Sequence, residues 1–272
     1  MHLAVALFAT DLTSDIRDVA RAAEDAGFES MFVAEHTHIP TSRETPYPMG
    51  GDLPDEYSRT LDPFVALMAA AAVTERLRLG TGVCLVVERD PIVLAKEIAT
   101  LDVLSGGRVL LGVGAGWNVE ELADHGVAFA ERWGVLHDRV RLMQELWRDD
   151  VAAYDGKHAS LPPSWQWPKP AQPEVPVLVG GGGRRAMQLA IDVGGGWMPM
   201  PSREKFPDRM AALAALAGDA GRPVPPVTLY LVRPDRDVVA HYADIGVERV
   251  VFLLPTRGDA VAGLRDIAAK VL

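Results

Sequence analysis

The sequence predicts a closed (β/α)8 barrel, an α/β fold, and three observations support this. Short apolar runs alternate with longer amphipathic stretches from end to end, giving eight strand–helix pairs in 272 residues. The strand segments are continuously apolar rather than alternating, which is typical of parallel strands covered by helices. Eight such units in this length favour a closed barrel over an open sheet. No linker interrupts the series, so residues 1–272 are expected to form one domain.

The strands are identified as apolar runs that end at glycine, proline or charged residues. They are predicted at 3–8, 30–36, 77–85, 108–116, 176–181, 195–200, 227–232 and 247–254. The stretches between them have helical spacing. They are predicted as helices at 13–27, 61–74, 90–107, 119–148 with a break near Gly126, 184–194, 203–221, 236–246 and 259–272.

Capping residues support several of these helix boundaries. Thr13 or Ser14 is expected to cap the first helix, and Gly27 to end it. In the second helix Asp62 is expected as the cap, with Pro63 at the first helical position.

Two segments are too long to be ordinary barrel connections. Residues 37–60 are rich in proline, glycine and charge, and residues 155–175 hold five prolines and two tryptophans. Long loops in a compact barrel commonly form lids or site walls. A plain surface excursion is the alternative for each segment.

Composition excludes some partners. The formal net charge of -10 argues against nucleic acid and against an anionic membrane surface, because phosphate binding needs a basic face. One cysteine, Cys84, excludes an internal disulfide framework and fits a reducing cytoplasm. The apolar start of the chain lacks a basic flank, so we interpret it as a strand and not a signal peptide. No stretch reaches the ~18 apolar residues of a membrane helix.

Candidate site residues are sought at the carboxyl ends of the strands, where active sites of such barrels lie. Glu35 and His36 end the second strand and could relay a proton or hydrogen-bond a ring, unless their role is structural. Four glycines precede Arg184 at the start of a helix: Gly180, Gly181, Gly182 and Gly183. Outward backbone N–H groups beside an arginine form an anion site; the alternative is a flexible turn.

The glycines of "GVGAGWN" (112–118) do not form a dinucleotide-binding loop. That motif requires a third glycine where this chain has Trp117, and it belongs to a first βα unit, whereas this is the fourth. The histidines show no metal-ligand spacing, so no metal site is predicted. Cys84 has no activating partner in the sequence and is interpreted as a small apolar wall residue.

Residues 100–147 resemble the central signature of the bacterial luciferase-like monooxygenase superfamily, most closely its branch of F420-dependent oxidoreductases. Four other motifs support the resemblance: "FVAEH" (32–36), "LGTGVCLVVERDPIVLAKEIATLD" (79–102), "PVLVGGGG" (176–183) and "GGWMP" (195–199). The resemblance implies a TIM barrel that holds a flavin or deazaflavin at the strand carboxyl ends. In this branch it implies coenzyme F420 as the hydride carrier.

The resemblance also implies roles for particular residues. A non-proline cis peptide is expected at Gly82–Val83, behind the ring. Glu35 and His36 match an acidic residue and a histidine at the polar edge of the ring, as the catalytic pair. The remaining cofactor contacts that it implies are Gly114, Ala115, Gly116 and Trp117 beside the ring or its ribityl chain, and Gly180, Gly181, Gly182, Gly183 and Arg184 at the phosphate.

Trp117 departs from the pattern, because relatives that act on sugar phosphates resemble this chain but carry a glutamate there. We therefore expect a more apolar substrate pocket formed by Trp117, Trp197, Met198 and Met200. The leading hypothesis is an F420-dependent oxidoreductase acting on a small organic molecule. An FMN-dependent monooxygenase and a non-catalytic F420-binding protein are the alternatives. The resemblance further implies a homodimer.

Overall fold

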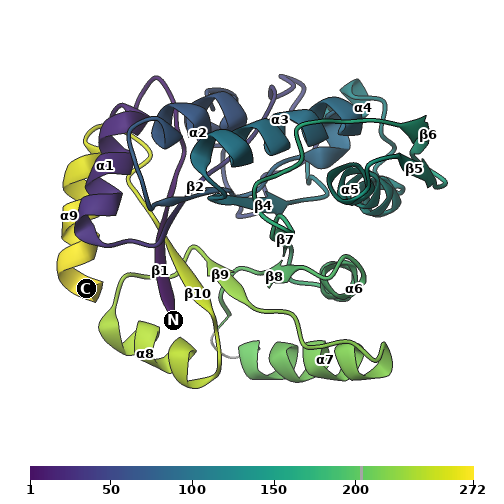
Figure 1. Cartoon of the computed structure of the whole chain (residues 1–272). Coiled ribbons are helices and arrows are strands. Elements are labelled where there is room, and N and C mark those ends of the chain that lie inside the picture. The colour runs from purple at the N-terminus through teal and green to yellow at the C-terminus, as the bar shows by residue number, and fades with distance from the viewer. Residues whose placement is uncertain (203–204) are drawn as a thin grey trace.

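Eight parallel strands form one sheet that curls into a barrel, as the sequence predicts (Figure 1). The computed structural model describes residues 1–202 and 205–272. The strands are β1 (His2–Leu7), β2 (Ser30–Val33), β3 (Arg78–Thr81), β4 (Val109–Val113), β7 (Val177–Gly180), β8 (Gly196–Met198), β9 (Thr228–Tyr230) and β10 (Arg249–Leu253). Their order in the sheet is β8-β7-β4-β3-β2-β1-β10-β9. A bridge between Trp197 and Val227 joins β8 to β9 and closes the barrel.

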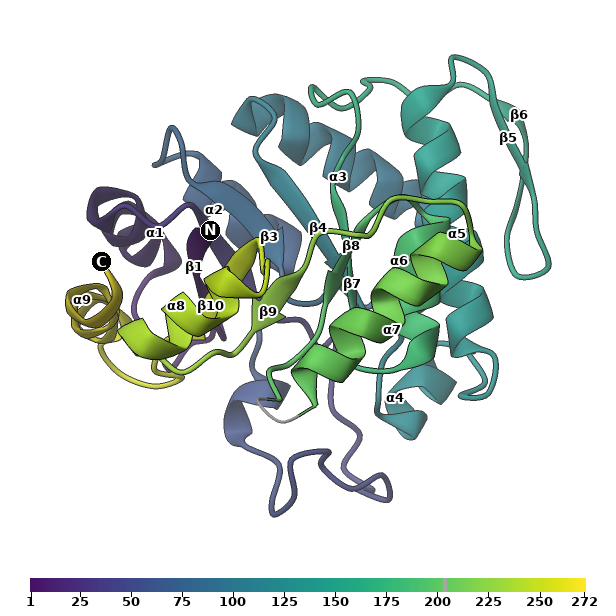
Figure 2. The ribbon, with the colours of Figure 1, turned by 90° about the horizontal axis from the view of Figure 1, so that it is seen from below.

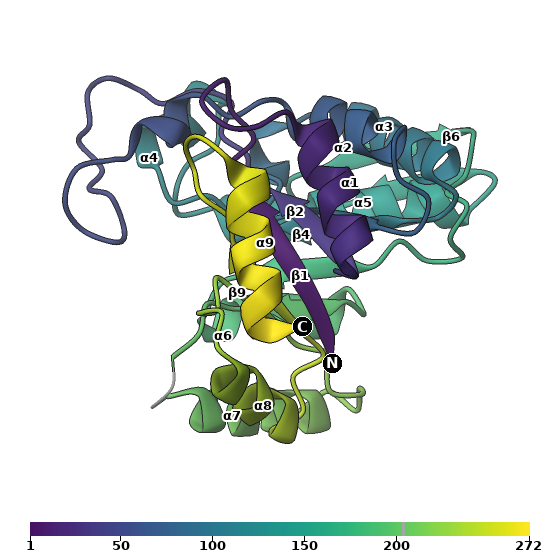
Figure 3. The ribbon, with the colours of Figure 1, turned by 90° about the vertical axis from the view of Figure 1, so that its left-hand side faces the viewer.

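The helices surround the barrel, and α1 and α9 lie side by side on one flank (Figures 1 and 3). Their bounds are α1 (Ile16–Ala26), α2 (Pro63–Ala71), α3 (Pro91–Ser105), α4 (Val119–Asp124), α5 (Arg132–Arg148), α6 (Arg184–Asp192), α7 (Phe206–Asp219), α8 (Arg236–Asp244) and α9 (Ala260–Val271). Two short 3-10 helices are η1 (Asp55–Ser58) and η2 (Val86–Glu88). The expected helix start at residue 203 lies outside the described residues.

The cap of α2 is confirmed, whereas the cap predicted for α1 is wrong. Asp62 accepts hydrogen bonds from the backbone of Phe64 and Val65, each at 3.0 Å. In α1 the capping residue is Asp15, whose Oδ1 lies 2.8 Å from the backbone nitrogen of Arg17. Ser14 cannot perform this role because its hydroxyl accepts a hydrogen bond from Ala260, at the start of α9. Because Ser14 is engaged in a contact with α9, the cap lies one residue later, at Asp15.

The third strand is shorter than predicted because the chain turns sharply after Thr81. The Gly82–Val83 peptide is cis, as expected, and η2 follows a few residues later. Cys84 returns to the sheet through one isolated bridge to Val113. The apolar run continued past the strand because this segment is buried against α5, and burial alone does not identify a strand.

Part of the segment 155–175 was wrongly predicted as loop. A β-hairpin projects from the barrel, formed by β5 (Ala152–Asp155) and the antiparallel β6 (Ser160–Ser164) (Figure 2). Two prolines lie in β6, which is possible because a strand in a two-stranded sheet has one edge without partners. The prolines therefore did not exclude a strand at this position.

The barrel interior requires glycine where β4 approaches β3. A Cβ atom on Gly112 would lie 1.9 Å from the backbone oxygen of Thr81. A Cβ atom on Gly114 would lie 2.5 Å from Val83 Cγ2, and one on Gly180 would lie 2.9 Å from Val83 Cγ1. The Val83 side chain thus occupies the top of the barrel, in space that two glycines leave open.

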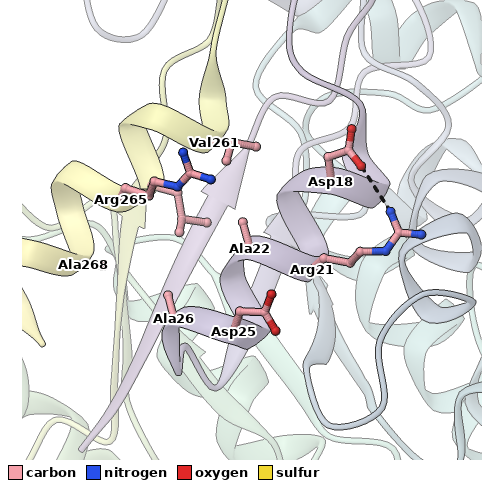
Figure 4. A pocket seen from close by; sticks show the side chains of 9 residues that line it. Asp18, Arg21, Ala22, Asp25, Ala26, Val261, Arg265 and Ala268 are labelled. Atoms are coloured by element: carbon pink, nitrogen blue, oxygen red, sulfur yellow. Dashed lines mark hydrogen bonds and ion pairs between the residues drawn. The ribbon is translucent and has the colours of Figure 1, made fainter.

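Two surface hollows lie away from the carboxyl ends of the strands. One, of about 500 Å³, is a groove on the outer flank in which Ala22 and Ala26 of α1 face Val261 and Arg265 of α9 (Figure 4). The other, of about 590 Å³, lies where β7 and β8 begin. Among the described residues, no helix has the length and hydropathy needed to cross a membrane.

Gly112→Ala is expected to destabilise the fold by about 3 kcal/mol or more, because its methyl group would meet a backbone oxygen that cannot move aside. Urea unfolding followed by circular dichroism measures the free energy. Gly218→Ala in α7 is the matched control, because nothing lies within 4 Å of its added methyl group. A Gly112→Ala chain as stable as the control would contradict the close approach of β4 and β3.

Candidate active site

His36 follows β2 and is held by a carboxylate from another strand–helix unit. Its Nδ1 lies 2.9 and 3.0 Å from the two carboxylate oxygens of Glu121. Both side chains are almost wholly buried, at 7% and 2% exposed. Thr60 exchanges two hydrogen bonds with the His36 backbone and fixes the turn. Nε2 forms no hydrogen bond with the described residues, so it is the nitrogen free to meet a ligand.

Glu121 was missed by the sequence reasoning, although a signal was present. Asn118 caps α4, with its Oδ1 accepting from the backbone of Glu120 and Glu121. An asparagine followed three residues later by a glutamate is a capping pattern, and it places that glutamate in the first helical turn. Here the carboxylate reaches across to His36 instead of back to the cap.

Glu35 lies beside His36 in the sequence but its carboxylate binds other groups. One carboxylate oxygen accepts from the backbone of Leu85 at 2.7 Å, and the other accepts from Arg89 Nε at 2.6 Å. Arg89 also pairs with Asp62, at 2.5 Å. Glu35 therefore stabilises the turn that follows β3. Its geometry suits a positioning residue, and Glu121 is the acid that contacts His36.

The predicted cofactor residues of three strands meet around Val83. The cis peptide Gly82–Val83 follows β3, and the Val83 side chain contacts the positions of Gly114 and Gly180. Beneath it, a Cβ atom on Gly82 would lie 2.4 Å from the Tyr230 hydroxyl oxygen. Gly82, Gly114 and Gly180 carry no side chains, so Val83 is the side chain that lies among these backbone segments. This region, named here the ring surface, is where a planar ring could rest.

Aromatic rings gather on the His36 side of this surface. The centroid of Trp117 lies 5.9 Å from that of His36, 6.2 Å from Tyr47 and 6.4 Å from Tyr57. The two tyrosine hydroxyls are 3.0 Å apart, and burial raises the pKa of Tyr57. Both tyrosines come from the long loop 37–60, which projects beside α4 (Figure 3). Thr45 attaches this loop to Glu120 of α4, with its backbone nitrogen 2.7 Å from the carboxylate.

The prediction that Trp117, Trp197, Met198 and Met200 form an apolar pocket is wrong in part. Trp117 is half-buried in the aromatic cluster, but Trp197 is fully buried, stacked on Phe206 with its Nε1 donating to the Gly181 oxygen at 2.7 Å. Met198 belongs to the barrel interior, and Met200 is exposed. Trp197 therefore supports the glycine loop from below, and the tyrosines of loop 37–60 replace it beside Trp117.

The four glycines lead into α6 without a capping side chain. Gly183 occupies the N-cap position, and Gly181 has a φ of 123°, a conformation that favours glycine. The next residues, Arg184 and Arg185, open the helix. Uncapped backbone N–H groups at a helix start attract anions.

Two further arginines lie at this loop. Arg209 of α7 approaches Gly182, where an added Cβ would lie 3.4 Å from its Nη1. Arg132 opens α5; burial and the charge of Arg185 lower its pKa, and its buried Nε has no partner. Within residues 1–202 and 205–272, none of the four arginines forms an ion pair with an acidic side chain. This concentration of unpaired positive charge fits an anionic ligand.

Glu88 is a buried acid that no pattern in the sequence singles out. Its side chain is 1% exposed, and Oε1 has no hydrogen-bond partner. Burial, reinforced by the nearby charges of Glu121 and Glu35, raises its pKa to about 9. Glu88 thus carries its proton at neutral pH.

Glu88→Gln is expected to change how stability depends on pH. Between the ordinary value of 4.5 and about 9, the folded chain holds one proton that the unfolded chain has lost. Stability therefore falls with rising pH in this window, by about 1.4 kcal/mol per pH unit from this group. The substitution removes that loss, so the variant gains stability relative to wild type as pH rises.

Urea unfolding at several pH values in this window measures the effect. Glu131→Gln, in which the original side chain is half exposed, is the control. Parallel stability curves for Glu88→Gln and wild type would show that Glu88 is ionised in the folded chain.

The described residues contain no group of three His, Cys, Asp or Glu side chains able to hold a metal ion. They do fit an organic cofactor that has a planar ring and an anionic tail. Asn118, almost wholly buried near the end of β4, has an amide nitrogen with no partner. Gly114 and Gly180 make room for the Val83 side chain, and Gly181 is exposed at the start of the glycine loop. The ring surface, this donor and the arginine-rich loop together form the candidate site.

Comparison with known sequences gives a family and several relatives. Residues 7–247 match the family described as luciferase-like monooxygenase. An uncharacterized protein of Mycobacterium tuberculosis is 44% identical, covering 100% of this chain and 99% of its own length. An F420-dependent glucose-6-phosphate dehydrogenase of Amycolatopsis mediterranei is 33% identical over 68% of this chain and 52% of its own length.

Solved structures share the fold at low sequence identity. The monooxygenase RslO1 of Streptomyces bottropensis has a TM-score of 0.79 at 20% identity, covering 99% of this chain and 98% of that one. An F420-dependent secondary alcohol dehydrogenase in complex with an F420-acetone adduct has a TM-score of 0.74 at 19% identity, with the same coverage. A riboflavin lyase with modified FMN has a TM-score of 0.68 at 19% identity, covering 90% and 66%.

Proposed function

Because this chain belongs to the luciferase-like monooxygenase family, we propose that it is an oxidoreductase that uses coenzyme F420. The observation that carries the proposal is the set of arginines without acidic partners at the glycine loop, in a site that also holds His36 with an unbonded Nε2. The F420-dependent dehydrogenase among the sequence relatives supports the same cofactor.

When bound, F420 supplies a carbon centre that accepts or gives a hydride. The chain itself provides binding and proton transfer. Gly82, Val83 and Gly114 would support the ring, with Ala115, Gly116 and Trp117 beside it. The loop Gly180–Gly183 and Arg184 would bind the phosphate. His36 Nε2 would take a proton from a substrate hydroxyl, or return one to a carbonyl, while Glu121 holds Nδ1 and stabilises the charged ring.

The aromatic cluster supports a neutral substrate with a ring or other apolar body. Trp117, Tyr47 and Tyr57 offer edges and faces for packing near His36, whereas none of them offers a charge to a sugar phosphate. We propose a secondary alcohol or the corresponding ketone, because its oxidation needs one hydride acceptor and one base. We also propose that this reaction takes place in a reducing cytoplasm.

The main alternative is FMN-dependent monooxygenation, since one solved structure with this fold is a monooxygenase and another is a riboflavin lyase with modified FMN. The two cofactors differ in their tails. FMN ends at its phosphate, whereas in F420 the phosphate is followed by carboxylates. Four arginines exceed the needs of one phosphate, and this supports F420. A non-catalytic F420-binding protein would need no proton acceptor, and His36 with its buried carboxylate argues against it.

The purified chain is expected to bind F420 more tightly than FMN, measured by fluorescence titration. Arg185→Gln should weaken F420 binding about tenfold, because a charged hydrogen bond contributes about 1.5 kcal/mol. Arg265→Gln, an exposed arginine on α9, is the matched control (Figure 4). Tight FMN binding with no F420 binding would refute the proposed cofactor.

His36→Ala is expected to slow turnover by about 100-fold or more, with F420 affinity changed by less than about threefold. Steady-state oxidation of a panel of ring-bearing secondary alcohols measures turnover. His241→Ala, on the outer helix α8, serves as the control. Equal turnover in both variants would remove His36 from the proposed chemistry.

We further propose that the chain forms a homodimer through α2 and α3. Val65 and Val93, near the starts of these helices, are 73% and 56% exposed, and Trp165 is 80% exposed. Gln166 donates to the Ile92 oxygen, which places the tryptophan segment beside α3. Such an exposed apolar patch is typical of an interface.

Light scattering of wild type is expected to give twice the chain mass. The double variant Val65→Glu, Val93→Glu should give the single mass, because like charges would face each other across the interface. Val151→Glu changes an equally exposed valine outside α2 and α3 and should leave the dimer intact. A monomeric wild-type chain would exclude this interface.

A further inference from the structure

The last part of loop 37–60, which includes η1, has its own attachments to the barrel. Asp55 pairs with Arg257, which follows β10, at 2.6 Å. The ring centroid of Tyr57 lies 5.0 Å from that of Phe8, which follows β1. Tyr57 therefore keeps its position beside the barrel through contacts that do not involve the rest of the loop.

The outer part of the loop, residues 39–54, is attached to the start of α4 (Figure 3). The carboxylate of Glu120 accepts hydrogen bonds from the backbone nitrogen of Thr45, at 2.7 Å, and from the Thr45 hydroxyl. The same hydroxyl oxygen accepts from the backbone nitrogen of Val119, at 3.2 Å. In the part of the chain that the structure describes, every hydrogen bond from residues 39–54 to a residue outside the loop ends at these two residues of α4.

Glu120 is an ionised hydrogen-bond acceptor. The hydrogen bond from the Thr45 hydroxyl is the largest influence on this carboxyl group, and it lowers the pKa of Glu120 to about 2. The carboxylate is therefore charged at neutral pH, and hydrogen bonds to a charged acceptor are stronger than those to a neutral one. Both carboxylate oxygens are bound by the loop, one by the Thr45 nitrogen and the other by its hydroxyl.

Tyr47 lies two residues after Thr45, so the attachment to α4 fixes the chain next to it. The Tyr47 hydroxyl is 3.0 Å from that of Tyr57, and its ring centroid lies 5.3 Å from Tyr57 and 6.2 Å from Trp117. Tyr57 has contacts of its own with the barrel, and Trp117 belongs to the connection between β4 and α4. Tyr47 is thus the member of the aromatic cluster whose position depends on Glu120.

We propose that Glu120 is a positioning residue that sets the substrate selectivity of the site. By holding Thr45 it keeps Tyr47 in the aromatic cluster, so that a ring-bearing alcohol finds an additional surface to pack against near His36. This proposal rests on the proposed function. The adjacent carboxylates of α4 then have separate tasks, because Glu121 orients His36 and Glu120 holds the loop that contacts the substrate.

The two tasks have different kinetic consequences. Release of Tyr47 removes packing against the ring of a substrate, but it leaves His36, Glu121 and the ring surface in place. KM for a ring-bearing alcohol should therefore rise while kcat is retained, as expected when an interaction contributes equally to the ground state and the transition state. A small alcohol such as isopropanol has no ring to pack on Tyr47, so its KM should not depend on Glu120.

The attachment can be tested on the ligand-free chain by nitration of tyrosine with tetranitromethane, followed by mass spectrometry of the peptides. In Glu120→Ala, Tyr47 should be nitrated about tenfold faster than in wild type, the factor that corresponds to one charged hydrogen bond. Tyr154 on β5, whose hydroxyl bonds Asp138, is the internal reference and should react at the same rate in both chains.

Two further variants distinguish the attachment from a general loosening of the fold. Glu120→Gln should restore the slow nitration of Tyr47, because the amide oxygen still accepts from the Thr45 nitrogen and the amide group can bond its hydroxyl. Glu131→Ala removes a carboxylate whose ion pair, with Lys157, lies outside the loop, and should react as wild type does. Equal nitration of Tyr47 in Glu120→Ala and wild type would overturn the proposal.

Selectivity is measured on the F420-loaded chain with two secondary alcohols, methylphenylcarbinol and isopropanol. In Glu120→Ala, KM for methylphenylcarbinol should rise about tenfold, with kcat changed by less than about threefold. KM for isopropanol should equal that of wild type, and Glu120→Gln should recover the wild-type KM for both alcohols.

An equal rise in KM for both alcohols, or a loss of kcat for both, would refute the selective role of Glu120. Absence of turnover by wild type with every alcohol would refute the proposed function and the selectivity that rests on it. The nitration result is independent of turnover, and by itself it decides whether Glu120 holds Tyr47 in the site.

Discussion

The position of the Val83 side chain is the constraint on which the rest of this site depends. It fills the top of the barrel, directly between β4 and β7, and the glycines at 114 and 180 leave the space for it. A larger residue at either position would push the turn after β3 outward. The ring surface therefore results from packing inside the barrel, before any ligand is considered.

The turn after β3 carries both the support for the proposed ring and the buried acid Glu88. Glu35 accepts from the Leu85 backbone and pairs with Arg89, so a buried ion pair fixes the segment 82–89. The same segment carries Val83 at one end and Glu88 at the other. Ring support and the buried acid are thus placed by one rigid piece of chain, and neither can shift without the other.

Sequence reasoning predicted the barrel, the eight strand–helix units and the cis peptide, because these depend on local patterns and on a strong family resemblance. It could not predict contacts between distant segments. Nothing local to Glu35 shows that its carboxylate turns toward Arg89, 54 residues further on. The aromatic cluster of Trp117, Tyr47 and Tyr57 was missed for the same reason. The two tyrosines lie in loop 37–60, whose position depends on its contact with α4. Trp197 was predicted to line the pocket because residues at strand ends in barrels often do so. In the structure it is buried, stacked on Phe206.

The unpaired arginines have a consequence for how quickly a ligand arrives. The chain as a whole carries a net charge of -10 and repels anions at a distance. Arg132, Arg184, Arg185 and Arg209 concentrate positive charge at the glycine loop, where the tail of a ligand would bind. At physiological salt this attraction of an anion acts over about 8 Å, against the repulsion by the net charge. If the proposed cofactor binds, its anionic tail would therefore be attracted to this loop before its ring reaches the barrel.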